Sequence, residues 1–137
     1  MQKRSVALLI AGIIFLLFGM LHAWSLLSFF YAWVYLGLAS FLFELLLLVI
    51  RFAMGIAGIL NWKKPHKASG CFVLGVVAFS VFIIAVLWGW VYDSLALIEF
   101  LLLNIVLQVA LTGLYVTYIL AAYKLAKSSH DTSVVAK

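Results

Sequence analysis

Two residues of opposite charge lie within a very apolar stretch of the chain, FELLLLVIRF at residues 43–52. Glu44 and Arg51 are seven residues apart, so an α-helix places them on nearly the same face, with roughly 10 Å of axial rise between their backbones. Ionisable side chains inside a membrane are costly and are often functional. The pair could therefore line a pathway for a proton, an ion or a small solute, or it could fix how helices pack.

The axial separation of Glu44 and Arg51 strains direct pairing, so each is expected to need a partner elsewhere. The last apolar span offers Asn104 near the level of Glu44 and Gln108 near the level of Arg51. Together with Thr112 these residues follow each other at intervals of four and form one polar stripe. Hydrogen bonds of this kind hold helices together in lipid, at about 0.5–2 kcal/mol each. We favour an interhelical polar network over a lined pathway, and both interpretations stay open at this stage.

Two further ionisable residues are candidates at the outer ends of the spans. His22 is expected at the outer end of the first span, where a histidine beside Trp24 is typical of interfacial anchoring. Glu99 is expected near the outer start of the last span, where the helix dipole favours a negative charge. As the alternative, both are outer-mouth candidates for binding a cation or a substrate.

The sequence predicts no catalytic site, no cofactor and no metal site. The three histidines, at positions 22, 66 and 130, are expected on opposite sides of the membrane and cannot share one metal ion. The chain has a single cysteine, Cys71, which therefore has no internal disulfide partner and is expected to pack as a small apolar residue. No nucleophile–base pattern and no phosphate-binding glycine loop occurs.

The elements that carry these residues are predicted from hydropathy. Of the 137 residues, 69% are hydrophobic and 9% are charged, which is too apolar for a water-soluble domain of this size. The sequence predicts an all-α, integral membrane four-helix bundle within residues 1–126. We place the spans at about 5–23, 35–60, 69–91 and 95–123, an outer interfacial segment at 24–34, and a polar, mobile cytoplasmic tail at 127–137.

Two boundaries admit alternatives. The second span could instead cover 28–50, and Arg51 would then be an anchor at the inner boundary, which weakens the pathway interpretation. The first span follows a basic start and could act as a signal peptide. Its apolar run is long for that role and a good cleavage site is missing, so we interpret it as an uncleaved span.

Basic residues predict the orientation. Eight of the nine Lys and Arg lie near the N-terminus, in the 61–67 loop or near the C-terminal end, and the ninth is Arg51. The positive-inside rule then predicts cytoplasmic N and C termini. The net charge of +5 is assigned to these membrane anchors and not to nucleic-acid binding. A bacterial inner membrane is the expected location.

Small residues mark expected helix contacts, because small side chains spaced four apart let backbones approach closely. They fall in three of the predicted spans: Gly19 and Ala23 in the first; Ala53, Gly55, Ala57 and Gly58 in the second; Gly70 and Gly75 in the third.

The stretch GIAGILNWKKPHKASGCFVLGVV at 55–77 resembles small bacterial four-span membrane proteins of unknown function. The resemblance implies a four-helix membrane fold and supplies no functional residues. Small multidrug exporters carry a key glutamate in the first helix, and the first span here has no acid. The polar and phenylalanine motifs of dimeric fluoride channels are not matched either.

These observations predict a non-enzymatic membrane protein in contact with the lipid bilayer. The first hypothesis is an accessory or assembly subunit of a larger membrane partner protein, or a self-associating component that forms a homo-oligomer. The second is a homo-oligomeric channel or small transporter with Glu44 and Arg51 near the path. The third is a lipid-interacting protein that uses the 24–34 segment.

Overall fold

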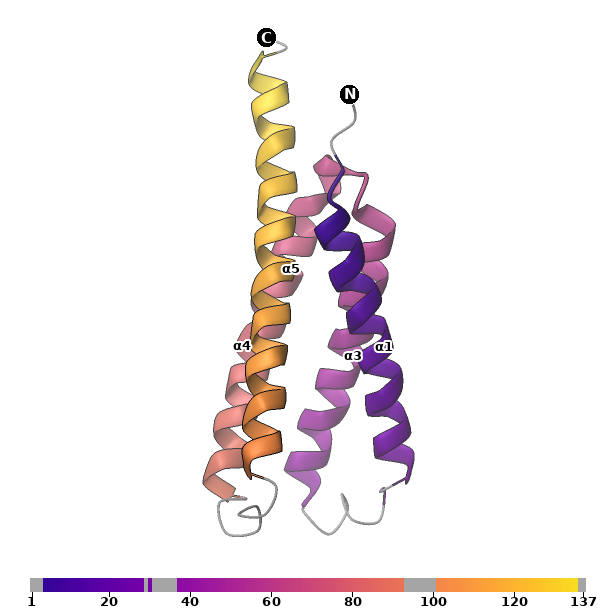
Figure 1. Cartoon of the computed structure of the whole chain (residues 1–137), viewed down its shortest axis with the longest axis vertical. Coiled ribbons are helices and arrows are strands. Elements are labelled where there is room, and N and C mark those ends of the chain that lie inside the picture. The colour runs from indigo at the N-terminus through magenta and orange to yellow at the C-terminus, as the bar shows by residue number, and fades with distance from the viewer. Residues whose placement is uncertain (1–3, 29, 31–36, 93–100, 136–137) are drawn as a thin grey trace.

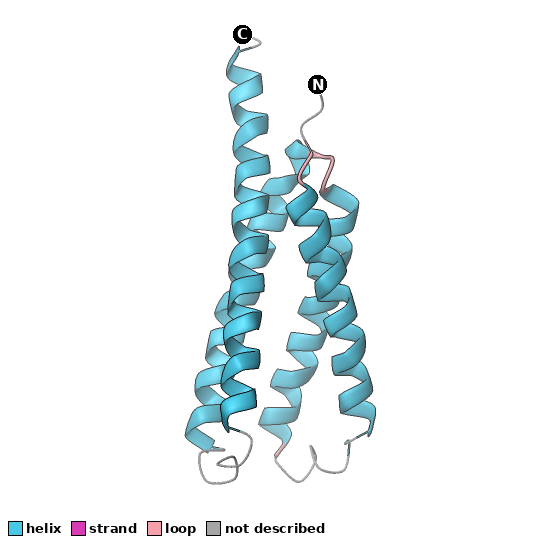
Figure 2. Cartoon of the chain, in the orientation of Figure 1, coloured by secondary structure: helices cyan, strands magenta, loops and turns pink. Residues whose placement is uncertain are grey.

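Four long helices form the chain. The computed structural model describes residues 4–28, 30, 37–92 and 101–135. Every regular element in this part is helical (Figure 2). The elements are α1 (Val6–Ser28), α3 (Leu38–Asn61), the short 3-10 helix η1 (Pro65–Lys67), α4 (Ala68–Tyr92) and α5 (Leu101–Val135).

All four long helices are long and apolar enough to cross a membrane. This confirms the predicted all-α class with four spans and indicates a multi-pass membrane protein. Many large apolar side chains are exposed on the outer faces of the bundle, such as Leu27, Val49, Leu87 and Val109. Such faces are unfavourable in water and suit contact with lipid chains.

The helix bounds differ from the sequence prediction in two places. The first helix continues past Ala23 to Ser28, so residues 24–28 of the expected interfacial segment are part of α1; residues 29 and 31–36 lie outside the described part. The last helix continues through the expected mobile tail and ends at Val135. At 35 residues it measures roughly 50 Å, longer than a membrane core, and it projects beyond the other helices (Figure 1).

The described N-terminal and C-terminal ends lie at the same end of the bundle, together with the turn between α3 and α4 (Figure 1). The Ser5 amide donates a hydrogen bond to the Trp62 carbonyl at 2.9 Å, which fastens the start of α1 to this turn. Pro65 is the first residue of η1, a position where its missing N–H costs nothing. The Lys63 ammonium lies 4.5 Å from the centre of the Trp62 ring.

Helices α1 and α3 approach each other closely at three glycines. A Cβ atom added to Gly12 would lie 3.0 Å from the Gly55 carbonyl oxygen and 3.2 Å from the Gly58 Cα atom. The predicted contact role of Gly55 and Gly58 therefore agrees with the geometry, whereas Gly12 was not singled out from the sequence. Gly70 differs from expectation, because a Cβ there would meet nothing within 4 Å.

Aromatic side chains fill the centre of the bundle and join α1, α4 and α5. Phe15 of α1 packs edge-on against Tyr115 and Tyr118 of α5, with ring centres 4.9 and 5.7 Å apart. Phe82 of α4 stacks on Tyr115 at 4.9 Å. Phe15, Tyr115 and Tyr118 are fully buried, so this cluster holds α5 in place against α1 and α4.

The glycine contact gives a first prediction. Gly12→Ala should lower the free energy of unfolding in mild detergent by about 1–3 kcal/mol, because the added methyl meets backbone atoms that cannot move independently. Gly113→Ala is the matched control, since a Cβ there meets nothing within 4 Å, and its stability should be unchanged or slightly higher. Equal effects of the two substitutions in a denaturant titration would contradict the close contact.

Candidate functional site

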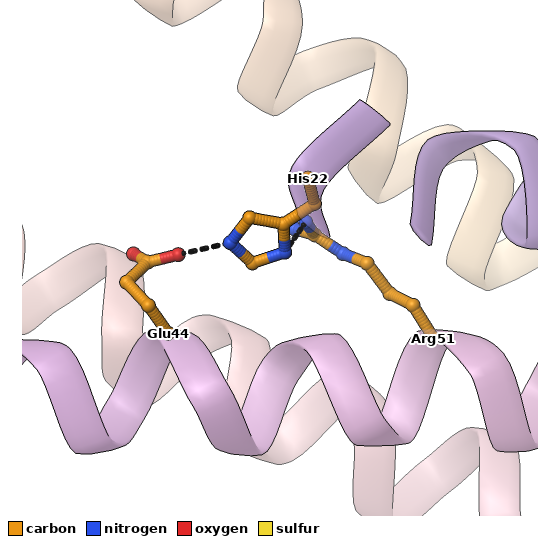
Figure 3. Close-up of polar contacts among 3 residues, drawn as sticks. All are labelled: His22, Glu44 and Arg51. Carbon is orange, nitrogen blue, oxygen red and sulfur yellow. Dashed lines mark hydrogen bonds and ion pairs between the residues drawn. The ribbon is translucent and has the colours of Figure 1, made fainter. Parts of the chain in front are cut away.

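A cluster of three ionisable side chains joins α1 to α3. The His22 ring lies between Glu44 and Arg51 (Figure 3). Its Nε2 atom is 2.7 Å from Glu44 Oε2, and its Nδ1 atom is 2.8 Å from Arg51 Nη1. The histidine thus bridges the gap of nearly two helix turns that keeps Glu44 and Arg51 apart on one helix.

Regular spacing places the three side chains on facing helix surfaces. On α3, Glu44 and Arg51 share a stripe with the buried residues Leu47 and Met54, at intervals of three or four residues. On α1 the buried face includes Leu8, Ala11, Gly12, Phe15, Gly19 and Leu26. His22 is three residues after Gly19 and four before Leu26. It therefore lies on the face of α1 that packs against α3, together with Gly12 and Gly19.

Arg51 is the most deeply buried of the three residues. Arg51 is only 8% exposed, while the side chains of His22 and Glu44 are 10% and 27% exposed. A guanidinium buried in an apolar bundle requires a counter-charge or acceptors. Arg51 donates a hydrogen bond to Nδ1 of His22. His22 in turn contacts the carboxylate of Glu44, so the guanidinium and the carboxylate are linked through the ring.

The two contacts specify the protonation pattern of the ring. An arginine N–H only donates, so Nδ1 of His22 accepts from Arg51 and carries no proton. Nε2 then carries the proton and donates it to the Glu44 carboxylate. In this arrangement the ring is neutral and the charges of Glu44 and Arg51 cancel, so the cluster as a whole has no net charge. A second ring proton would place an N–H against the Arg51 donor and break that contact.

The cluster extends toward α5 through Tyr115. The guanidinium of Arg51 lies close enough to the Tyr115 hydroxyl for the two groups to interact electrostatically. Among the described residues, neither Arg51 Nε nor the Tyr115 hydroxyl has a hydrogen-bond partner. One turn further, the Tyr118 hydroxyl donates to the Met54 carbonyl at 3.1 Å. Polar groups therefore connect α1, α3 and α5 across the middle of the bundle.

The polar stripe predicted on the last span lies on α5. The Thr112 hydroxyl donates to the Gln108 carbonyl of its own helix at 2.8 Å. Gln108 is partly exposed. Asn104 belongs to α5, but its side chain lies outside the described part, and so does Glu99. The pairing of Glu44 with Asn104 and of Arg51 with Gln108 stays a prediction.

The contacts of His22 with Glu44 and Arg51 were not predicted from the sequence. We expected a histidine at the outer boundary, separate from Glu44 and Arg51, because the first span was ended at Ala23. The helix continues to Ser28, so His22 lies within it and meets both charges. Tyr115 was not predicted as part of the site, although a tyrosine in an apolar span needs a partner for its hydroxyl.

Among the described residues, no group of three His, Cys, Asp or Glu side chains could hold a metal ion. Cys71 is buried, and its thiol lies 3.6 Å from both the Asn61 amide nitrogen and the Ala57 carbonyl oxygen. These contacts join α3 to α4 and give the cysteine a structural environment.

Comparisons with protein-family models, with curated proteins and with solved structures found no match to this chain. The functional argument therefore depends on the chemistry of the cluster itself.

The bridging position of His22 gives a second prediction. His22→Ala should destabilise the protein by about 2–4 kcal/mol, because it removes the partner of both Glu44 and Arg51. Thermal unfolding in detergent provides the measurement. His66→Ala is the control, since His66 is exposed in η1, and it should leave stability unchanged. A destabilisation shared equally by both variants would contradict the bridge.

A double-mutant cycle on Glu44 and Arg51 measures the coupling free energy between the two charges. Glu44→Gln and Arg51→Gln each leave one uncompensated charge, whereas the double variant leaves none. The double variant should therefore be more stable than the sum of the single losses predicts, by about 1–2 kcal/mol. Simple additivity would show that the two charges are not coupled through His22.

Proposed function

We propose that this chain is a non-enzymatic membrane component whose His22–Glu44–Arg51 cluster locks α1 to α3, and that it acts as an accessory or self-associating subunit. The observation that supports this is that the two charges are linked within one chain. His22 contacts both Glu44 and Arg51, at 2.7 and 2.8 Å, and the resulting group is neutral. Such a cluster stabilises a scaffold without requiring a substrate.

The proposed orientation follows from where the positive charge gathers. Apart from Arg51, the described basic residues lie before α1, in the 63–67 turn or in the last part of α5. The chain direction brings these three regions to one end of the bundle (Figure 1). The positive-inside rule favours the cytoplasmic side for this end, and a bacterial inner membrane is the proposed location.

A specific observation favours a second candidate, a homo-oligomeric channel or small transporter. Arg51 Nε and the Tyr115 hydroxyl are buried polar atoms without a hydrogen-bond partner among the described residues. Buried unsatisfied groups are rare and often mark a functional position. Together with the partly exposed Glu44 side chain, they could form part of a path for a proton or a small cation.

The orientation gives a third prediction. In a Cys71→Ala background, Lys64→Cys should react with a membrane-impermeant maleimide only after right-side-out vesicles are opened, because the 63–67 turn is assigned to the inside. Ser28→Cys, at the opposite end of α1, is the control and should react in intact vesicles. The reverse labelling pattern would contradict the orientation and leave the fold unaffected.

A fourth prediction separates the two candidate functions. Purified protein in vesicles with imposed proton and potassium gradients should show no more flux than protein-free vesicles, and Arg51→Gln should not change this. Isolation from native membranes in mild detergent, followed by mass spectrometry, should yield a homo-oligomer or one second protein at fixed stoichiometry.

Two outcomes would overturn the subunit proposal. A flux that is present in the unmodified protein and lost in Arg51→Gln would favour the channel or transporter. A monomer that elutes without any second protein would contradict an assembly role.

A further inference from the structure

A cleft of about 510 Å³ lies between the start of α1 and the last part of α5. The segments that line it, the start of α1 and the last part of α5, lie at the end of the bundle where the chain termini are found (Figure 1). None of His22, Glu44 and Arg51 lines it. Two basic side chains, Arg4 and Lys124, line it together with the hydroxyl residues Ser5 and Ser128. Its volume falls in the range of small-ligand sites, roughly 300–1,000 Å³.

No acidic side chain is among the described residues that line this cleft. Arg4 and Lys124 are exposed, and the contact between His22 and Glu44 involves neither of them. The described acid closest in sequence is Asp131, which is seven residues beyond Lys124 and does not line the cleft. Two positive charges therefore remain available to an anion.

The positive charge is confined to one part of the cleft along α5. Lys124, Leu125 and Ser128 belong to the outer part, while Leu120, Ala121 and Thr117 belong to the part nearer the middle of the helix. The Thr117 hydroxyl already donates a hydrogen bond to the Gly113 carbonyl. Lys124 is only one turn past Leu120, so the charge lies where the apolar span ends. A soluble phosphate would use the basic part alone, whereas a molecule with an anionic head and apolar chains would use both.

We propose that this cleft binds the headgroup of an anionic phospholipid, with the phosphate between Arg4 and Lys124 and the acyl chains along the apolar wall of α5. Basic pockets between membrane helices are known to recognise anionic headgroups. The hydroxyls of Ser5 and Ser128 already bond within their own helices, as acceptor from the Leu8 amide and as donor to the Leu125 carbonyl. The two cations therefore provide the main attraction. The site depends on membrane insertion and not on the proposed subunit role.

The test measures lipid retention by the full-length purified protein. The protein is mixed with phosphatidylglycerol or phosphatidylcholine in detergent micelles, and bound lipid is counted by native mass spectrometry. We expect phosphatidylglycerol to be retained on the order of tenfold more strongly than phosphatidylcholine. Arg4→Gln with Lys124→Gln should abolish this preference.

Two further variants distinguish a cleft from a charged surface. Lys63→Gln with Lys64→Gln removes the same charge from exposed positions of the neighbouring turn and should keep the preference. Ala7→Trp places a large ring in the cleft, which Ala7 lines, and should lower retention without changing charge. Unfolding temperatures of all variants show whether each is folded.

Three results would overturn the proposal. Equal loss in both double variants would show unspecific attraction to positive charge. Equal retention of the two lipids would show apolar binding alone. Displacement of phosphatidylglycerol by millimolar inorganic phosphate would identify a site for a soluble anion.

Discussion

A guanidinium inside an apolar bundle has to be neutralised and hydrogen-bonded, and this requirement governs how α1 and α3 pack. Arg51 cannot reach Glu44 directly along its own helix, so the connection passes through His22 of the neighbouring helix. That contact fixes both the rotation and the axial register of α1 against α3. A shift of one residue on either helix would turn His22 away and leave two charges unpaired in the bundle, at a cost of several kcal/mol.

The glycine contacts and the polar cluster are consistent with one register. Gly12 meets Gly55 and Gly58, and Gly19 meets the ring of Phe52, so the contacts move back along α3 as they move forward along α1. His22 and Arg51 continue the same antiparallel order. The small residues permit the short distance between the backbones, and the polar residues select one alignment among those that small residues allow. The tyrosines of α5 then pack against this pair from the other side.

The fold was predictable from the sequence to a greater extent than the site. Hydropathy alone indicates four spans, and the seven-residue spacing correctly indicates that Glu44 and Arg51 share a face and need partners on another helix. The identity of that partner was missed because the end of the first span was placed at Ala23, which left His22 at the boundary. The signal available in the sequence is the spacing of Phe15, Gly19, His22 and Leu26 at intervals of three or four residues, which places His22 on the same helix face as these three. The helical extension of α5 through 127–135 has no apolar periodicity, so hydropathy could not indicate it.

The two polar regions of the molecule have opposite electrostatic character, and this difference bears on their roles. The His22 cluster is neutral and largely enclosed, so it presents little field to the surroundings. The cleft between Arg4 and Lys124 is charged, open and unpaired within the described residues, so it attracts anions from outside. A neutral cluster inside the bundle can hold it in one shape while a basic cleft at the end where the chain termini lie contacts the anionic surface of the membrane. The distribution of charge therefore separates the group that stabilises the scaffold from the group that interacts with its environment.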